Sequence, residues 1–223
     1  MTTFQNAARL QTSFLNSIER RVLVWLAERM PKAINSDHLT ALAAVAMAGA
    51  GLAYAVSRVW APALLFVNVF LAINWFGDSL DGTLARVRNH QRPRYGFYVD
   101  HVIDCVGAAM LFIGLGASGY MHMTVALSVL IAYLLLSAEV YLATYTRQTF
   151  RMTYFKLGPT ELRILLALGN TVAFYKPTIT VAGNTLLWLD AAGVLMAVGL
   201  GLTLLYSIWG NTVALYNEER IPN

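Results

Sequence analysis

The stretch that decides the fold, residues 78–104, reads DSLDGTLARVRNHQRPRYGFYVDHVID. It carries two pairs of carboxylates: Asp78 and Asp81 end one long apolar segment, and Asp100 and Asp104 begin the next. The pairs are spaced by three and four residues, so on helices each pair shares a face. Four unpaired carboxylates near a membrane are costly unless cations lie between them, and oxygen-only ligands favour Mg²⁺, Mn²⁺ or Ca²⁺ over zinc. The stretch therefore predicts two helices whose aspartates converge on metal ions.

Small residues border both acidic stripes. Gly82 and Ala85 continue the first stripe, and Gly96 precedes Asp100 by one turn. A residue with almost no side chain lets a bulky polar group approach the backbone. The alternative is a set of helix-end carboxylates that form ion pairs, but it explains neither the matched spacings nor the small residues. In that alternative the candidate ion-pair partners of the aspartates are Arg86, Arg88, Arg92 and Arg94.

The same stretch resembles the signature of the CDP-alcohol phosphotransferase (CDP-alcohol phosphatidyltransferase) family. That signature is Asp-x-x-Asp-Gly-x-x-Ala-Arg, a short spacer, and Gly-x-x-x-Asp-x-x-x-Asp. The spacer has nine residues here instead of about eight, and the extra residue falls in a Pro-containing loop that accommodates it easily. Every fixed position of the signature is filled, by Asp78, Asp81, Gly82, Ala85, Arg86, Gly96, Asp100 and Asp104.

The resemblance implies roles for these residues. Two Mg²⁺ or Mn²⁺ ions would be held by Asp78, Asp81, Asp100 and Asp104, with Asp104 also the candidate general base. The CDP moiety would lie against Asp81, Gly82, Ala85, Arg86 and Gly96. Arg86 would contact phosphate or orient an aspartate, or else be an ordinary arginine at the membrane boundary. The resemblance also implies a homodimer.

Composition predicts an all-α integral membrane protein. The chain is 57% hydrophobic and 13% charged, with a mean hydropathy of +0.55, whereas a soluble domain carries about twice that charged fraction. We expect residues 1–34 to form an amphipathic juxtamembrane segment and residues 35–223 one transmembrane domain. We predict six spans, each long enough to cross a hydrocarbon core of about 30 Å. The fifth span is interrupted by Asn170, Lys176 and Pro177. The spans are His38–Val59, Pro62–Arg86, Tyr95–Ser118, His122–Thr149, Thr160–Ala182 and Leu186–Tyr216.

The N-terminal segment, from about Phe4 to Met30, has an apolar face and is predicted to be a helix on the membrane surface. An ordinary packed surface helix is the alternative. The face comprises Leu15, Ile18, Val22, Trp25 and Leu26.

Positive charges predict the orientation. Of the sixteen lysines and arginines, only Arg58 and Lys176 fall on the outer side when the N-terminus is inside. This bias predicts a multi-pass protein of the cell (inner) membrane, with the N-terminus and the aspartates on the cytoplasmic side.

Residues for an acceptor substrate are expected near the end of the fourth span. Glu139 lies within the predicted membrane segment, where a carboxylate is by default a functional candidate. It would line the acceptor pocket or pair with a buried basic group. Arg147 and Arg151, with Lys156 and Arg163, would bind an anionic acceptor such as a sugar or polyol phosphate, or would only satisfy the positive-inside bias.

The expected function is phospholipid biosynthesis: metal-dependent transfer of a substituted phosphoryl group from a CDP-linked donor, preferably CDP-diacylglycerol, to an acceptor hydroxyl, with release of CMP. Glu139-x-Tyr141 and the run 158–161 (GPTE) are similar to the choline/ethanolamine branch, which makes a CDP-aminoalcohol:diacylglycerol phosphotransferase an alternative. However, Thr144-Tyr145-Thr146 lacks the histidine of that branch. Membrane prenyltransferases and cation transporters are alternatives from other classes. The expected partners are the CDP-linked donor, an alcohol acceptor, membrane lipids and a second copy of the chain, and no nucleic acid.

Overall fold

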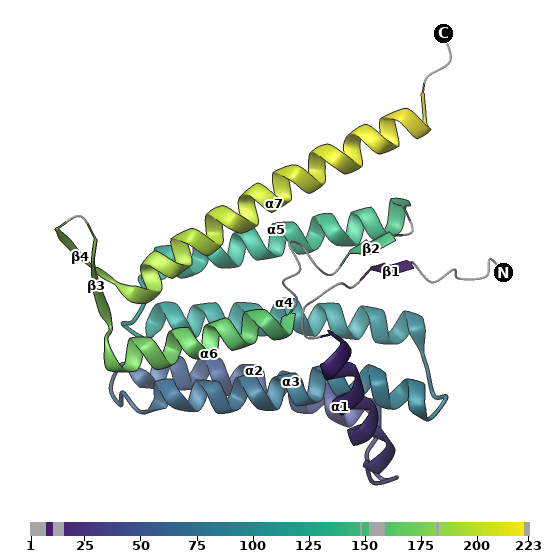
Figure 1. Cartoon of the computed structure of the whole chain (residues 1–223), viewed down its shortest axis with the longest axis horizontal. Coiled ribbons are helices and arrows are strands. Elements are labelled where there is room, and N and C mark those ends of the chain that lie inside the picture. Colours follow the sequence, from purple (N-terminus) through teal and green to yellow (C-terminus); the bar gives the residue numbers. More distant parts are fainter. Residues whose placement is uncertain (1–7, 11–15, 148, 152–158, 182, 221–223) are drawn as a thin grey trace.

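Seven helices account for most of the computed structural model, which describes residues 8–10, 16–147, 149–151, 159–181 and 183–220 (Figure 1). The helices are α1 (Asn16–Arg29), α2 (Ser36–Ser57), α3 (Ala63–Val87), α4 (Pro93–Ala117), α5 (Met123–Arg147), α6 (Pro159–Tyr175) and α7 (Trp188–Glu218). Four short strands are β1 (Ala8–Leu10), β2 (Thr149–Arg151), β3 (Thr178–Val181) and β4 (Asn184–Leu187). The predicted all-α membrane fold is confirmed.

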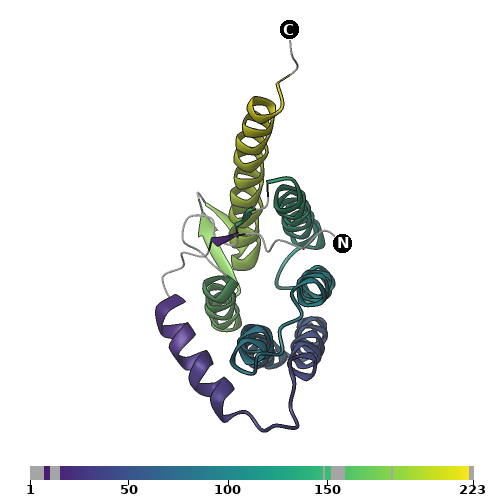
Figure 2. The ribbon, with the colours of Figure 1, turned by 90° about the vertical axis from the view of Figure 1, so that its right-hand side faces the viewer.

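Helices α2 to α7 run up and down, so their ends gather in two sets (Figure 1). The start of α2 and the α3–α4 loop lie at one end, which we call the site end. Figure 2 looks onto this end and shows α2 to α6 grouped together, with α7 beyond α5. In the sequence, Arg58 and Lys176 follow α2 and α6 at the opposite end.

Five helices, α2 to α5 and α7, are long and apolar enough to cross a membrane. Helix α6 has 17 residues, which span about 26 Å at helical rise, short of a core of about 30 Å. It nevertheless lies in line with the other helices (Figure 1). The count of six spans therefore stays a prediction.

The predicted extension of the fifth span to Ala182 is wrong. Helix α6 ends at Tyr175 because Pro177 cannot continue a helix and restricts the residue before it. Strands β3 and β4 then pair as an antiparallel hairpin, with Gly183 at φ +82° in the turn. The last helix consequently begins at Trp188 and not at the predicted Leu186.

The predicted N-terminal helix is shorter than expected. Residues 8–10 form β1, which pairs in parallel with β2 just after α5, and α1 begins only at Asn16. Residues 1–7, Leu15 and the side chain of Ile18 lie outside the described part of the chain. Helix α1 buries Leu23 and Ala27 against α2 and α3, while Val22 and Trp25 are 42% and 53% exposed. An apolar side turned away from the bundle is what an interfacial helix requires.

Glycines allow α2, α3 and α4 to pack closely. A Cβ added at Gly77 would lie 2.5 Å from the Leu39 carbonyl oxygen, and one at Gly114 would lie closer than 3.0 Å to the Gly51 carbonyl oxygen. Helix backbones this close leave no room for a side chain, and small residues at such crossings are typical of membrane helix pairs.

A buried polar network joins α6 to α2 and α3. The Tyr54 hydroxyl donates to Asn170 Oδ1 (2.7 Å), and Asn170 Nδ2 donates to Asn68 Oδ1 (2.9 Å). Tyr54 and Asn170 are both 0% exposed. Asn170, which interrupts the apolar pattern of the predicted span, therefore holds α6 to the bundle, since its amide finds partners inside.

Candidate metal centre

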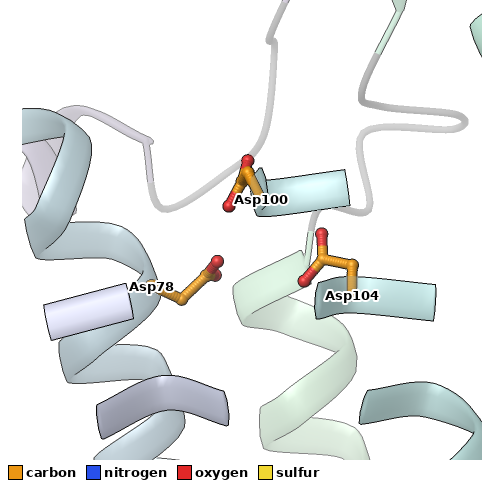
Figure 3. Close-up of side chains that lie close together, drawn as sticks. All are labelled: Asp78, Asp100 and Asp104. Atoms are coloured by element: carbon orange, nitrogen blue, oxygen red, sulfur yellow. The ribbon is translucent and has the colours of Figure 1, made fainter. Parts of the chain in front are cut away.

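Three aspartates from two helices meet at the site end. Asp78 lies in the second half of α3, and Asp100 and Asp104 lie one helical turn apart in the first half of α4. The connection between the helices, residues 88–92, is short, and Asn89 takes the left-handed conformation (φ 57°) that such a turn requires. One carboxylate oxygen from each of the three residues lies within 4.8 Å of the other two. Figure 3 shows the three side chains directed into one shared space.

The donor set fits a hard divalent cation. All three groups are carboxylates that are neither fully buried nor fully exposed, and oxygen ligands of this kind are what Mg²⁺ and Mn²⁺ prefer. Magnesium sites commonly use one or two carboxylates together with substrate phosphates, so three converging carboxylates leave coordination positions for a diphosphate.

An arginine from α6 lies against the same cluster. Arg163 Nη2 donates to Asp78 Oδ2 at 2.6 Å, and Arg163 Nε donates to Asn74 Oδ1 at 2.9 Å. Asn74 is buried and its amide nitrogen donates to the Ala43 carbonyl oxygen of α2 (3.1 Å). The Asp78 carboxylate is thus held by a cation that is itself oriented by a buried amide.

Asp81, the fourth predicted metal ligand, is turned toward α2. Its Oδ2 accepts from Thr40 Oγ1 at 2.5 Å, and its Oδ1 accepts from the Gly82 amide. Asp81 still lies close enough to Asp78 and Asp104 to interact with them electrostatically. The structure therefore groups three of the four predicted ligands, and a ligand or nucleotide role for Asp81 stays a prediction.

The small residues of the signature border open space. A Cβ at Gly96 would meet nothing within 4 Å, and one at Gly82 would meet only Arg86 Nη1, at 3.5 Å. Packing within the described chain therefore does not require glycine at either position, in contrast to Gly77 and Gly114. Arg86 Nη2 donates to Thr83 Oγ1 (2.9 Å).

A pocket of about 410 Å³ opens between the start of α2 and the end of α3. Ser36, Ala85, His90 and Arg92 are among the residues that line it. The pocket joins one of the small signature positions to basic side chains, a lining suited to a phosphate-bearing ligand. Arg92, named above as a partner for the aspartates, instead forms an ion pair with Asp37.

Arg88 has a structural role in the same region. Its Nη2 donates to the carbonyl oxygens of Met30 (2.8 Å) and Pro31 (3.0 Å), and its Nη1 donates to that of Ile34. The side chain thus fastens the α1–α2 connection to the end of α3. The arginine that pairs with the Asp78 carboxylate is Arg163, far from this loop in the sequence.

The predicted acceptor residues of α5 contact α7. Glu139 accepts from Ser207 Oγ (2.7 Å) and from Asn211 Nδ2 (2.6 Å), and Arg147 Nη1 donates to Asn211 Oδ1 (2.8 Å). The partners that the structure gives for the Glu139 carboxylate are neutral side chains, not a basic group. An acceptor role for Glu139 and Arg147 stays a prediction. Residue Arg151 is in β2, and its side chain lies outside the described part of the chain.

Sequence reasoning did not assign a role to Asn74, Tyr133 or Glu19. Asn74 could have been found, because it precedes Asp78 by four residues and shares its face. Tyr133 of α5 lies near Asp104 and Arg163, but an isolated tyrosine in an apolar span gives no signal. Glu19 contacts α3 and α6, which only the placement of α1 reveals.

Comparisons with known proteins agree with this geometry. The family profile described as CDP-alcohol phosphatidyltransferase matches residues 30–205. Among solved structures, the chain is similar to phosphatidylinositol phosphate synthase (PgsA1) of Mycobacterium tuberculosis, a crystal structure with CDP-DAG bound. The TM-score is 0.63 at 20% identity, over 86% of this chain and 94% of that one, which shows a shared fold. A search of curated protein sequences gives no match.

Proposed function

Because the chain belongs to the CDP-alcohol phosphatidyltransferase family, we propose that it makes a phospholipid or its precursor from CDP-diacylglycerol. The phosphatidyl group passes to an acceptor hydroxyl, and CMP leaves. The observation that carries the proposal is the convergence of Asp78, Asp100 and Asp104 within 4.8 Å, beside open space at Gly82 and Gly96. The related fold whose crystal structure has CDP-DAG bound supports a lipid-linked donor.

Metal binding is assigned to the aspartates. Asp78, Asp100 and Asp104, with Asp81 beside them, would hold two Mg²⁺ or Mn²⁺ ions, which would neutralise the diphosphate and polarise the phosphorus under attack. Arg163 keeps the Asp78 carboxylate directed into the cluster. Since displacement at phosphorus depends on alignment and charge compensation more than on covalent help, these residues serve mainly to position the donor.

Proton transfer is assigned to Asp104. The acceptor hydroxyl forms a new O–P bond at the phosphorus next to the lipid, while the P–O bond to CMP breaks. The hydroxyl proton passes to a carboxylate oxygen of Asp104. This residue is the last of the cluster along α4 and lies near Tyr133 of α5.

The CDP moiety is assigned to the face formed by Asp81, Gly82, Ala85, Arg86 and Gly96. Gly82 and Gly96 border space that no side chain of the described chain fills, and Ala85 lines the 410 Å³ pocket. Any larger side chain there would occupy the space that the diphosphate and the base require.

The acceptor is proposed to be anionic, because basic residues lie beside the cluster and at the end of α5. Arg163 is already beside the cluster, and Arg147 lies at the end of α5 with Asn211 and Glu139. Arg151 follows in the chain. Arginine in this setting suits a phosphate-bearing alcohol.

The experiment is a CMP-release screen with the purified protein in detergent and MgCl₂ or MnCl₂. CDP-diacylglycerol is paired with inositol phosphate, glycerol phosphate or serine, and CDP-choline or CDP-ethanolamine is paired with diacylglycerol. We expect CMP only with CDP-diacylglycerol and an anionic acceptor. CMP from an aminoalcohol pair would identify the alternative branch, and pyrophosphate from a prenyl diphosphate without any CMP would contradict the proposal.

We also propose that the site end faces the cytoplasm of a cell membrane, and that the protein is a homodimer. The positions of Arg58 and Lys176 at the other end support the orientation. Single cysteines at Arg92 and Trp60, in a Cys105→Ala background, would be probed with a membrane-impermeant maleimide on intact cells. Labelling at residue 92 but not at residue 60 would contradict the orientation, and a monomer in nanodiscs would contradict the dimer.

A further inference from the structure

Besides its apolar contacts with α3, helix α1 contacts α3 and α6 through the carboxylate of Glu19. Glu19 Oε1 accepts from Trp75 Nε1 of α3 at 2.8 Å and from Thr160 Oγ1 of α6 at 2.7 Å, and Ser79 Oγ of α3 lies at 3.4 Å. Three donors from two other helices thus converge on one oxygen. In Figure 2, α1 lies alongside the ends of α6 and α3.

These partners lie immediately beside the residues that form the cluster. Trp75 and Ser79 flank Asp78 on α3, and Thr160 precedes Arg163 by three residues on α6. Glu19 therefore joins α3 to α6 at the same level as the Arg163–Asp78 ion pair (2.6 Å). The Glu19 contact is made by α1, whereas the Arg163–Asp78 ion pair joins α6 directly to α3.

Apart from the contacts of Arg163 with Asn74 and Asp78, the polar contacts that the structure gives between α3 and α6 are distant from the cluster. Asn68, in the second turn of α3, contacts Asn170 and Thr171 in the second half of α6. Asn68 is ten residues from Asp78 and Asn170 is ten from Thr160, which is about 15 Å at helical rise. A rotation of about 4° around these distant contacts moves the site end of α6 by about 1 Å over this length. A displacement of about 1 Å is enough to impair a metal or catalytic site.

We infer that Glu19 is a positioning residue for the metal site: it fixes α6 against α3, so that Arg163 holds Asp78 in register with Asp100 and Asp104. The inference rests on the proposed metal role of the aspartates. It assigns α1 a function in the reaction beyond contact with the membrane surface. The side of α1 that exposes Val22 and Trp25 is free to meet lipid, while Glu19 points inward.

The test measures Mn²⁺ binding directly, by the loss of free-Mn²⁺ electron paramagnetic resonance signal, together with the thermal unfolding midpoint of each variant in detergent. Glu19→Ala removes the acceptor and leaves Trp75 and Thr160 without it. We expect Mn²⁺ affinity to fall about tenfold, in the range typical of residues that orient metal ligands. Glu19→Gln keeps the acceptor oxygen and is expected to bind Mn²⁺ within about threefold of wild type.

The controls separate positioning from general stability. Glu28→Ala changes the other glutamate of α1, which is exposed, and is expected to bind Mn²⁺ as wild type does. A Glu19→Ala protein that unfolds at a lower temperature but binds Mn²⁺ with wild-type affinity would overturn the inference, and so would equal losses in Glu19→Ala and Glu19→Gln. If the wild-type protein itself bound no Mn²⁺, the proposed metal role of the aspartates would fail together with the inference.

Discussion

Replacing Arg163 with alanine would remove the cation that pairs with Asp78 in the cluster. The oxygens of Asp78, Asp100 and Asp104 lie within 4.8 Å of one another, and two unit charges at that separation repel by about 3.5 kcal/mol at an effective dielectric of about 20. The side chains of Arg163 and Asp78 are only 18% and 22% exposed. Removal of one partner from a buried pair costs about 3–5 kcal/mol, and partial exposure favours the lower end of that range.

The metal-free Arg163→Ala protein should therefore be destabilised by about 3 kcal/mol. For a chain of this size, that corresponds to a fall of about 6–12 °C in the unfolding midpoint. Divalent cations bound by the aspartates supply the missing positive charge, so saturating MnCl₂ should recover most of the loss. Arg163→Lys keeps the charge but cannot contact Asn74 and Asp78 together. Its unfolding midpoint should therefore lie between those of the wild type and of Arg163→Ala.

The assay is thermal unfolding in detergent, followed by intrinsic fluorescence, in EDTA and in MnCl₂. Arg58 is an exposed arginine at the opposite end, so Arg58→Ala is the matched control. Its unfolding midpoint should equal that of the wild type in both EDTA and MnCl₂. The reasoning is refuted if Arg163→Ala unfolds at the wild-type temperature in EDTA, or if its deficit is as large in MnCl₂ as in EDTA.

Three other outcomes are expected. Gly82→Leu should retain the wild-type unfolding midpoint but weaken CDP-diacylglycerol binding by at least tenfold in a titration, whereas Gly114→Ala should destabilise by about 1–3 kcal/mol through overpacking; the reverse pattern would remove Gly82 from the donor site. Asn170→Leu should destabilise by about 1–3 kcal/mol because the Tyr54 hydroxyl loses its buried partner, and a combined Asn170→Leu, Tyr54→Phe variant that is no more stable than the single one would argue against this network. Asp104→Asn should lower the rate of CMP release by at least about 10²-fold with donor binding largely kept, and wild-type turnover would exclude it as the base.

Much of the candidate site could be predicted from one short stretch of sequence. Asp78 and Asp104 come together because helical spacing and a short loop are local properties, determined within 27 residues. The end of α6 before Pro177 could also have been predicted from the sequence, because proline cannot continue a helix. Apolar length and composition were sufficient to predict a helical membrane protein.

Contacts between distant parts of the chain could not be predicted in the same way. Arg163 is 85 residues from Asp78, Thr160 is 141 from Glu19, and Ser207 is 68 from Glu139. Residues 8–10, predicted as helix, form a strand because β2 provides a partner. By itself, the sequence determined which carboxylates share a helical face and which segments are apolar, since both follow from neighbours along the chain. Only the tertiary structure decided which arginine, amide or glutamate meets them, because that depends on which helices pack together and in what rotation.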